Sequence, residues 1–375
     1  MKPTPATPAA FADRRNSVGF LRLLLAAVVL YSHAYFLGGF GRDHFSIFSR
    51  DAVSAGTLAV QCFFVLSGAL IATSWNRRHS LGRFLWHRFL RLAPALWVCL
   101  AVTAFVFTPV LHFHTPPPRT HFFELDPSAW DYVWRNLIFP RTKIAIPPYP
   151  NLTHWCGDWN GSLWTLFYEG FCYVVVAGLG LLGLLNRFRV AGGVVIVGFI
   201  ALCTFWTVCS PTPPGWLPTI TGRLFDTPGK QLTVLFLAGS AWAIFPEVSQ
   251  ALLRRRWVGP LACGLIVATW QLGLHAALGP WLLPPALFWT AQALPFANFE
   301  RWAGGDYSYG VYVYGYPIQQ ILAHFQLHTY GIVTYLAASF VLTGLCAFAS
   351  WRLVERPALA LKDLFHRTAR PPAPA

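Results

Sequence analysis

Ten apolar stretches follow one another along the chain, most of them separated by short polar segments. They lie at about residues 18–37, 57–74, 92–108, 163–185, 190–209, 231–246, 257–275, 281–297, 307–325 and 330–351. A helix rises about 1.5 Å per residue, so roughly 20 apolar residues cover the ~30 Å hydrocarbon core of a bilayer. The sixth, eighth and ninth stretches are short or interrupted by proline and glycine. With 55% hydrophobic and 11% charged residues, the sequence predicts an all-α, polytopic integral membrane protein with about ten transmembrane helices.

The basic residues are distributed unevenly between the two sides of such a bundle. An even number of spans places both termini on one side. If that side is the inside, 19 of the 28 lysines and arginines lie inside and 8 lie outside. Because lysine and arginine favour cytoplasmic loops, we expect both termini to be cytoplasmic. The net charge of +14 then follows from topology, and no nucleic-acid partner is expected.

Three segments lie outside the predicted spans or between them. We expect residues 1–17 to be a flexible cytoplasmic lead and 352–375 a cytoplasmic tail, on either side of a membrane domain at 18–351. The long connection at 109–162 is rich in proline, histidine, tryptophan and tyrosine, which predicts a folded cover on the outer membrane surface. Three histidines near its start lack an acidic or cysteine residue to complete a ligand set, so no metal site is expected.

Two ionisable side chains, Arg22 and His33, lie inside the first apolar stretch. Eleven residues at about 100° each place both on one helix face, roughly 16 Å apart. A buried guanidinium or imidazole is costly unless it is paired or hydrated, which predicts a cavity beside this face. The imidazole would be suited to take a proton from a hydroxyl. Alternatively, Arg22 reaches the lipid headgroups and His33 hydrogen-bonds a neighbouring helix.

Arg88 and Arg91 are three residues apart at the start of the third span, and therefore share a helix face. Paired arginines make bidentate bonds to phosphate, so a nucleotide-bearing cofactor is expected to dock here from the cytoplasm. The alternative is a basic loop whose charge serves only the topology.

Two further stretches carry polar groups at helical spacing. Ser162, Thr165 and Glu169 follow one another at intervals of three and four, and Glu169 is the only carboxylate well inside a predicted span. Such an acid is functional by default, although a structural pairing with Arg22 or another basic group is the alternative. Near residue 308, a serine and three tyrosines at helical spacing supply hydroxyls, or else form a packing stripe or interface belt.

Six short elements of the chain form a recognisable series. In order they are Arg22 with His33, Phe63 to Ile71 in the pattern FFxLSGxLI, Arg88 with Arg91 ahead of Pro94, Ser162-Leu163-Trp164 with Glu169, Ser308-Tyr309 with Tyr312 and Pro317, and Glu355-Arg356-Pro357. Together they resemble the membrane-bound acyltransferase 3 family, integral-membrane enzymes that O-acylate sugars. The chain departs from the family at Gly315, where many members carry a histidine, and in the opening of its first span, which reads VGFLRL.

The resemblance implies an acyltransferase of the bacterial inner (plasma) membrane. It would move an acyl group, in the first place acetyl, from acyl-CoA as co-substrate to a hydroxyl of a surface or secreted carbohydrate, with no bound cofactor. The implied catalytic residues are His33, Arg22 and Glu169, and Arg88 and Arg91 would hold the donor. The implied acceptor contacts are Asn160, Ser162, Trp164, Ser67, Ser308, Tyr309 and Tyr312.

The sequence leaves two points open. His33 could act as a general base or carry the acyl group briefly. The chain could also be a transporter or flippase in which Arg22, His33 and Glu169 line a polar pathway, or, as a weaker alternative, a sensor or scaffold without chemistry.

Overall fold

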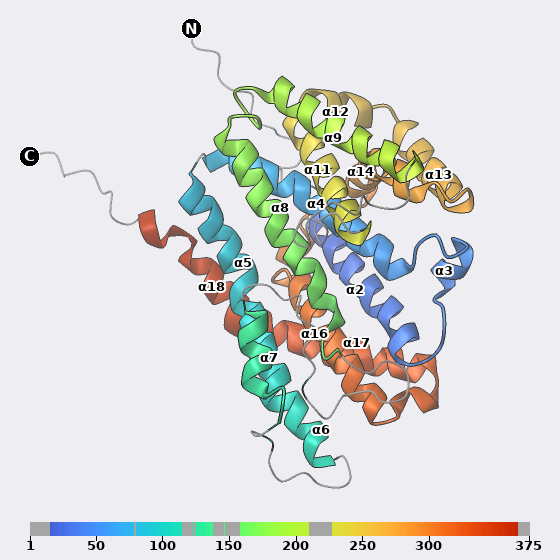
Figure 1. Ribbon diagram of the computed structural model, residues 1–375, viewed down its shortest axis with the longest axis vertical. Helices are drawn as coiled ribbons and strands as arrows, with labels where there is room; N and C mark the ends of the chain where they lie inside the picture. The colour runs from blue at the N-terminus through green and yellow to red at the C-terminus, as the bar shows by residue number, and fades with distance from the viewer. Residues whose placement is uncertain are drawn as a thin grey trace, which may run out of the picture.

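The computed structural model describes residues 16–78, 80–114, 122, 125–137, 146, 158–209 and 227–366; within these residues every regular element is a helix and there is no strand (Figure 1). This confirms the all-α class. Residues 1–15 of the expected lead, 367–375 of the expected tail and most of 115–157 in the long connection lie outside the described residues.

A helix occupies each of the ten apolar stretches. These helices are α2 (Val18–Leu37), α4 (Ala55–Arg78), α5 (Leu81–Val102), α8 (Trp164–Leu181), α9 (Arg189–Cys209), α11 (Thr227–Ile244), α13 (Val258–Gln271), α14 (His275–Ala293), α16 (Ser308–His324) and α17 (Ile332–Ser350). Shorter helices are α3 (His44–Phe48), α6 (Thr108–His114), α7 (Ala129–Asn136), α12 (Pro246–Leu253), α15 (Phe299–Ala303) and α18 (Arg356–Ala360). Single turns of 3₁₀-helix lie at Gly161–Leu163, Leu327–Tyr330 and Leu361–His366, and π-helical turns at Thr103–Phe107 and Trp351–Glu355.

Six helical segments of the described chain are long and apolar enough to cross a bilayer by themselves, and there are seven if the bent pair α11 and α12 counts as one span. The six are 18–37, 55–77, 81–114, 161–181, 189–209 and 332–364. The remaining helices are weaker candidates, because α13 has 14 residues, α16 has 17 and α14 contains three prolines. The protein is therefore a multi-pass membrane protein, and the figure of about ten spans stays a prediction.

Two helical segments are longer than their apolar stretches. The third segment begins at Leu81 rather than near 92 and continues through a π-helical turn to His114, so the start of the long connection is helical. The last segment continues past 351 through α18, which packs beside α5, so the first part of the expected tail belongs to the fold (Figure 1). The apolar stretch stops where basic residues begin, but the helix itself continues past that point.

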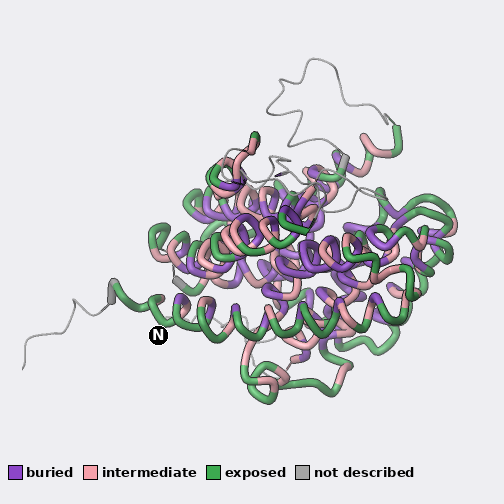
Figure 2. The backbone as a smooth tube through the Cα atoms, turned by 90° about the horizontal axis from the view of Figure 1, so that it is seen from below, coloured by how far each residue is buried: buried purple, intermediate pink, exposed green. Residues whose placement is uncertain are grey.

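Buried apolar side chains form two clusters. One comes mainly from α4, α8, α9, α11, α13 and α14, and the other mainly from α5, α6, α7, α16 and α17. Helix α2 contributes Leu21 to the first cluster and Ala34 to the second, so it lies between the two halves. Figure 2 shows buried residues concentrated in the middle of the molecule and exposed residues along the outer helices.

Helix α4 is the most buried of the candidate spans, with 67% of its apolar window inside the protein against 22% for α9. It packs against α11 through a reciprocal pair of glycines. A Cβ on Gly68 would collide with the carbonyl oxygen of Phe236, and a Cβ on Gly239 would collide with that of Val65. Ser240 donates to the Gly68 carbonyl across the same contact, at 3.1 Å. Small residues allow two backbones to approach closely, and here they fix the position of α4.

Candidate active site

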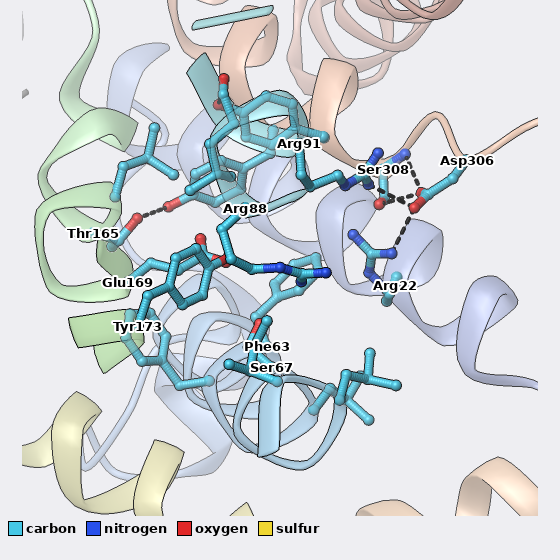
Figure 3. Close-up of a pocket in the computed structure, with 18 of the residues that line it drawn as sticks. Arg22, Phe63, Ser67, Arg88, Arg91, Thr165, Glu169, Tyr173, Asp306 and Ser308 are labelled. Carbon is cyan, nitrogen blue, oxygen red and sulfur yellow. Dashed lines mark hydrogen bonds and ion pairs between the residues drawn. The ribbon is translucent and has the colours of Figure 1, made fainter. Parts of the chain in front are cut away.

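A cavity of about 470 Å³ lies where α2, α4, α5, α8 and α16 meet (Figure 3). Its apolar wall comes from α4 and consists of Val60, Phe63, Phe64, Leu66, Leu70 and Ile71. The opposite side carries charged and hydroxyl-bearing side chains. This volume is within the range of small-molecule sites, and the combination of an apolar and a charged wall suits an amphiphilic ligand.

The structure brings eight of the twelve predicted site residues to this cavity. They are Arg22, Ser67, Arg88, Arg91, Glu169, Ser308, Tyr309 and Tyr312. The other four, His33, Asn160, Ser162 and Trp164, do not line it. Arg88 and Arg91 share a helical face of α5, as their spacing predicts, and both reach the cavity.

Asp306, which precedes α16, forms the centre of the charged wall. Its Oδ2 accepts from Arg22 at 2.5 Å and from Arg91 at 2.6 Å. Its Oδ1 accepts from the backbone N–H of Ser308 at 3.2 Å and from the Ser308 hydroxyl at 2.5 Å. Arg91 also lies 3.4 Å from a carboxylate oxygen of Glu355, which is buried. This ion-pair cluster joins α2, α5, α16 and the C-terminal end of the last long helical segment.

The two guanidinium groups keep Asp306 ionised. Burial alone would raise the pKa of this carboxyl group, but Arg22 and Arg91, with help from Ser308, hold its pKa below the ordinary value. Arg22 does not extend toward the lipid headgroups, the alternative considered from the sequence. It points into the protein and pairs with Asp306 (Figure 3).

Sequence reasoning missed Asp306 and Glu355 as partners. Both stand at the edges of apolar stretches, where an acidic residue looks like an ordinary loop residue. A signal was nevertheless present, since Asp306 lies two residues before Ser308, the spacing at which an aspartate side chain accepts from the backbone N–H two residues on.

Arg88 differs from the other two arginines of the cavity. Among the described residues no carboxylate lies within ion-pair distance of it, and its guanidinium carbon lies 6.0 Å from the centre of the Tyr173 ring. The Arg88 Nε is buried and has no hydrogen-bond acceptor. Arg88 is therefore a cation in the cavity wall, and no carboxylate in the described chain forms an ion pair with it.

Glu169 lies on the wall formed by α8 and accepts a hydrogen bond from the Tyr173 hydroxyl. The proposed structural pairing with Arg22 does not occur, since Arg22 pairs with Asp306 instead. Glu169 therefore presents a carboxylate to the cavity on the same side as Arg88 and Tyr173 (Figure 3).

A group of hydrogen-bonded hydroxyls in the cavity lining joins α8 and α16. The hydroxyls of Thr165 and Tyr312 lie 2.5 Å apart, and Tyr312 also donates to the Ser162 carbonyl at 3.0 Å. Tyr316 lies one turn further along α16, outside the cavity lining. The Thr165–Tyr312 contact thus lies on the side of the cavity that faces Tyr316.

His33 lies beside Tyr316 rather than in the cavity. The centres of the two rings are 5.2 Å apart and the rings meet edge to face. Among the described residues no hydrogen bond holds the imidazole. Arg22 thus lines the cavity as its helix face predicts, whereas His33 lies beside Tyr316, one turn of α16 after the lining residue Tyr312.

Asn160 and Trp164 have different positions from those expected of cavity residues. The Asn160 amide donates to the Val313 carbonyl at 2.8 Å and accepts from the Ser162 N–H at 3.2 Å, so it fixes the start of α8 against α16. Trp164 is exposed and meets Tyr168 edge to face.

Comparison with known proteins identifies the family. The family described as an acyltransferase domain matches residues 15–352. An O-acetyl transferase of Shigella phage Sf6 is 28% identical over 92% of this chain and 96% of its own length. Nodulation protein 10 of Rhizobium leguminosarum bv. viciae is 26% identical over 94% and 95%. Peptidoglycan O-acetyltransferase OatA of Listeria monocytogenes is 25% identical over 80% of this chain and 51% of its own length.

No solved structure matches the chain. The family match spans nearly the whole membrane domain and includes five of the six sequence elements, while the sixth, Glu355-Arg356-Pro357, lies just beyond its end. The resemblance seen in the sequence is therefore confirmed, and the chain belongs to the acyltransferase 3 family as a membrane-embedded O-acyltransferase.

Proposed function

We propose that this protein transfers an acetyl group from acetyl-CoA to a hydroxyl of a surface or secreted carbohydrate. The observation that carries the proposal is the two-walled cavity, in which Arg88 has no carboxylate within ion-pair distance among the described residues and α4 supplies an apolar face. Two relatives whose names denote O-acetyl transfer, one of them acting on peptidoglycan, support the choice of acyl group and acceptor class.

The donor fits the two walls in one orientation. Coenzyme A carries its phosphates at one end and an uncharged thioester arm at the other. Arg88 binds phosphate oxygens, since a guanidinium offers a planar fork of donors to that group. Arg22 and Arg91 add positive potential but share Asp306, so they contribute less directly. The arm then runs along Phe63 and Leu70 on α4 toward Tyr312.

His33 supplies the reactive imidazole beyond Tyr312. The acceptor oxygen attacks the thioester carbonyl carbon while its proton passes to His33, and the C–S bond breaks to release the CoA thiolate, which takes up a proton. In the second route the imidazole itself attacks first and hands the acyl group to the hydroxyl afterwards. Both routes require the thioester to pass the Thr165–Tyr312 contact.

The proposed orientation places the termini and the arginine end of the cavity in the cytoplasm of the inner membrane. The acceptor arrives from the outer side, toward which His33 lies on α2. This arrangement would link a cytoplasmic donor pool to an external glycan.

Proteoliposomes test the proposal directly. The probes are [¹⁴C]acetyl-CoA and the surface glycan of the source bacterium, de-O-acetylated by mild alkali. We expect label to appear in the glycan as an alkali-labile ester, and Arg88→Ala to reduce that transfer. A protein that moves either probe across the membrane without forming the ester would be a transporter, and the proposal would be wrong.

A further inference from the structure

Three residues of α16 beyond the cavity share one helical face and are almost fully buried. Tyr316 is 3% exposed, and Gln319 and Gln320 are 0% exposed. Gln319 and Gln320 lie three and four residues after Tyr316, so both lie about one helical turn beyond it, on either side of its position. Tyr316 meets His33, and its ring abuts Gly161, where a Cβ would fall 2.7 Å from the Tyr316 Cε2.

The orientation of both glutamine amides follows from their partners. The Gln319 Nε2 donates to the Leu30 carbonyl at 2.8 Å, and the Gln320 Nε2 donates to the Asp158 carbonyl at 2.9 Å. A backbone carbonyl can only accept, so the nitrogen of each amide must face it and the oxygen must face away. Both Oε1 atoms are then buried acceptors that no donor in the described chain satisfies.

The residues that anchor the two amides lie close to His33 and its neighbour Tyr316. Leu30, which anchors Gln319, lies one helical turn before His33 on α2. Asp158, which anchors Gln320, begins the short segment whose Gly161 abuts the Tyr316 ring. The next residue of that segment, Ser162, has a hydroxyl that is also buried without a partner.

Unsatisfied buried acceptors are costly, and native proteins keep few of them without a ligand, an ordered water or a catalytic use. Here two of them are adjacent in sequence and 0% exposed, one anchored to the helix that carries His33 and the other to the segment that contacts Tyr316. An amide oxygen accepts but cannot donate, so the missing partner is a donor-rich group. A carbohydrate with neighbouring free hydroxyls has that chemistry.

We propose that Gln319 and Gln320 form the acceptor subsite and bind hydroxyls adjacent to the one that is acylated. The assignment rests on the proposed function, because it requires a carbohydrate at His33. The attacking hydroxyl gives its only proton to the imidazole, so the two amide oxygens bind its neighbours on the ring. The subsite therefore selects sugars with free hydroxyls beside the acylation position.

Kinetics of Gln319→Met and Gln320→Met in proteoliposomes test this assignment. The probes are [¹⁴C]acetyl-CoA and the de-O-acetylated glycan, each titrated separately. We expect the KM for the glycan to rise roughly three- to tenfold in each variant, the loss of one neutral hydrogen bond, with the KM for acetyl-CoA within twofold of wild type. Gln319→Asn and Gln320→Asn keep the amide but withdraw the oxygen, and should show the same split if a methionine variant does not accumulate.

Gln61→Met is the matched control. Gln61 is a buried glutamine on α4 whose Oε1 is already paired with His275 at 2.7 Å. This variant should lower thermal stability without changing the KM for the glycan. An unchanged glycan KM in both α16 variants, or an equal rise in both KM values, would overturn the subsite. Absence of ester formation by the wild type would instead contradict the proposed function.

Discussion

Arg91 donates to Asp306 across 2.6 Å, and this ion pair ties α5 to the residue that precedes α16, 215 positions further along the chain. The same carboxylate oxygen also accepts from Arg22. One acid thus holds two of the three arginines of the cavity, while Arg88 is held by none in the described chain. The three guanidinium groups should therefore respond differently to substitution.

Arg88→Ala should weaken acetyl-CoA binding roughly 10- to 100-fold, because a charge-assisted bond to phosphate is worth about 1.5–3 kcal/mol. The melting temperature should change little, since Arg88 forms no ion pair with any residue that the structure describes. Arg88→Lys should restore only part of the affinity, because an ammonium lacks the planar fork. Calorimetric titration in nanodiscs measures the affinity, with Arg189→Ala, an exposed site paired with Glu247, as the control. Wild-type affinity in Arg88→Ala would remove the phosphate assignment.

Asp306→Asn should destabilise the fold by about 3–5 kcal/mol, because it leaves two largely buried guanidinium groups without their shared counter-ion. Denaturant unfolding in detergent measures the loss. Asp51→Asn provides the comparison, since Asp51 pairs with Arg42 at an exposed position and should contribute little. Equal stability of the two variants would show that the Asp306 cluster does not hold the helices together.

The stabilisation from Asp306 should be constant between pH 5 and pH 8. Its folded-state pKa lies below the ordinary value, despite burial, because of Arg22 and Arg91. A carboxyl group of this kind contributes fully above its unfolded pKa of about 3.9 and loses the contribution as the pH falls through the lower folded value. The stability difference between wild type and Asp306→Asn should therefore shrink only below about pH 4. A difference that changes steadily across neutral pH would assign the effect to another group.

His33→Ala should reduce acetyl transfer by about 10²–10⁴-fold, the usual contribution of a general base. Folding should survive, because the imidazole has one edge-to-face ring contact and no hydrogen bond within the described chain. His33→Gln should be nearly as inactive, since it cannot cycle a proton. Initial rates with [¹⁴C]acetyl-CoA measure this effect. Near wild-type transfer by His33→Gln would mean that the histidine is only structural.

Labelling with a membrane-impermeant maleimide should report the orientation in a variant without the eight native cysteines. Arg135→Cys, at the exposed end of α7, should be modified in intact spheroplasts, and Arg255→Cys, between α12 and α13, only after the membrane is opened. The reverse pattern would invert the proposed topology. Both positions are exposed, so accessibility alone does not separate them.

The sequence predicted the positions of the helices more successfully than their ends. Apolar stretches mark where a helix is buried in lipid or protein, which is why a helix occupies each of the ten. The segment from Leu81 begins eleven residues before its apolar stretch, because its first three turns carry arginines and histidine on an amphipathic face. Helix propensity continues where hydropathy ends, so a hydropathy criterion cannot find that boundary.

The sequence predicted correctly those parts of the candidate site that depend only on the spacing of residues along one helix. Arg88 and Arg91 reach one cavity because three residues is nearly one turn of a single helix. The position of His33 could not be predicted in this way. Spacing places it on the face of Arg22, but the space beside that face depends on how α16 crosses α2, and neither His33 nor Tyr316 lines the cavity. The pairing of Arg22 with Asp306 likewise depends on contacts between distant segments.

The glycine pair between α4 and α11 restricts how this enzyme can be evolved toward other donors. A methyl group at Gly68 or Gly239 would collide with a backbone carbonyl of the facing helix. The two helices therefore cannot be moved apart stepwise by substituting slightly larger side chains at these positions. The same helix carries the apolar wall of the cavity on its other side. Directed evolution for longer or bulkier acyl chains should therefore select smaller side chains at Phe63 or Leu70, and the two glycines should stay unchanged throughout the lineage.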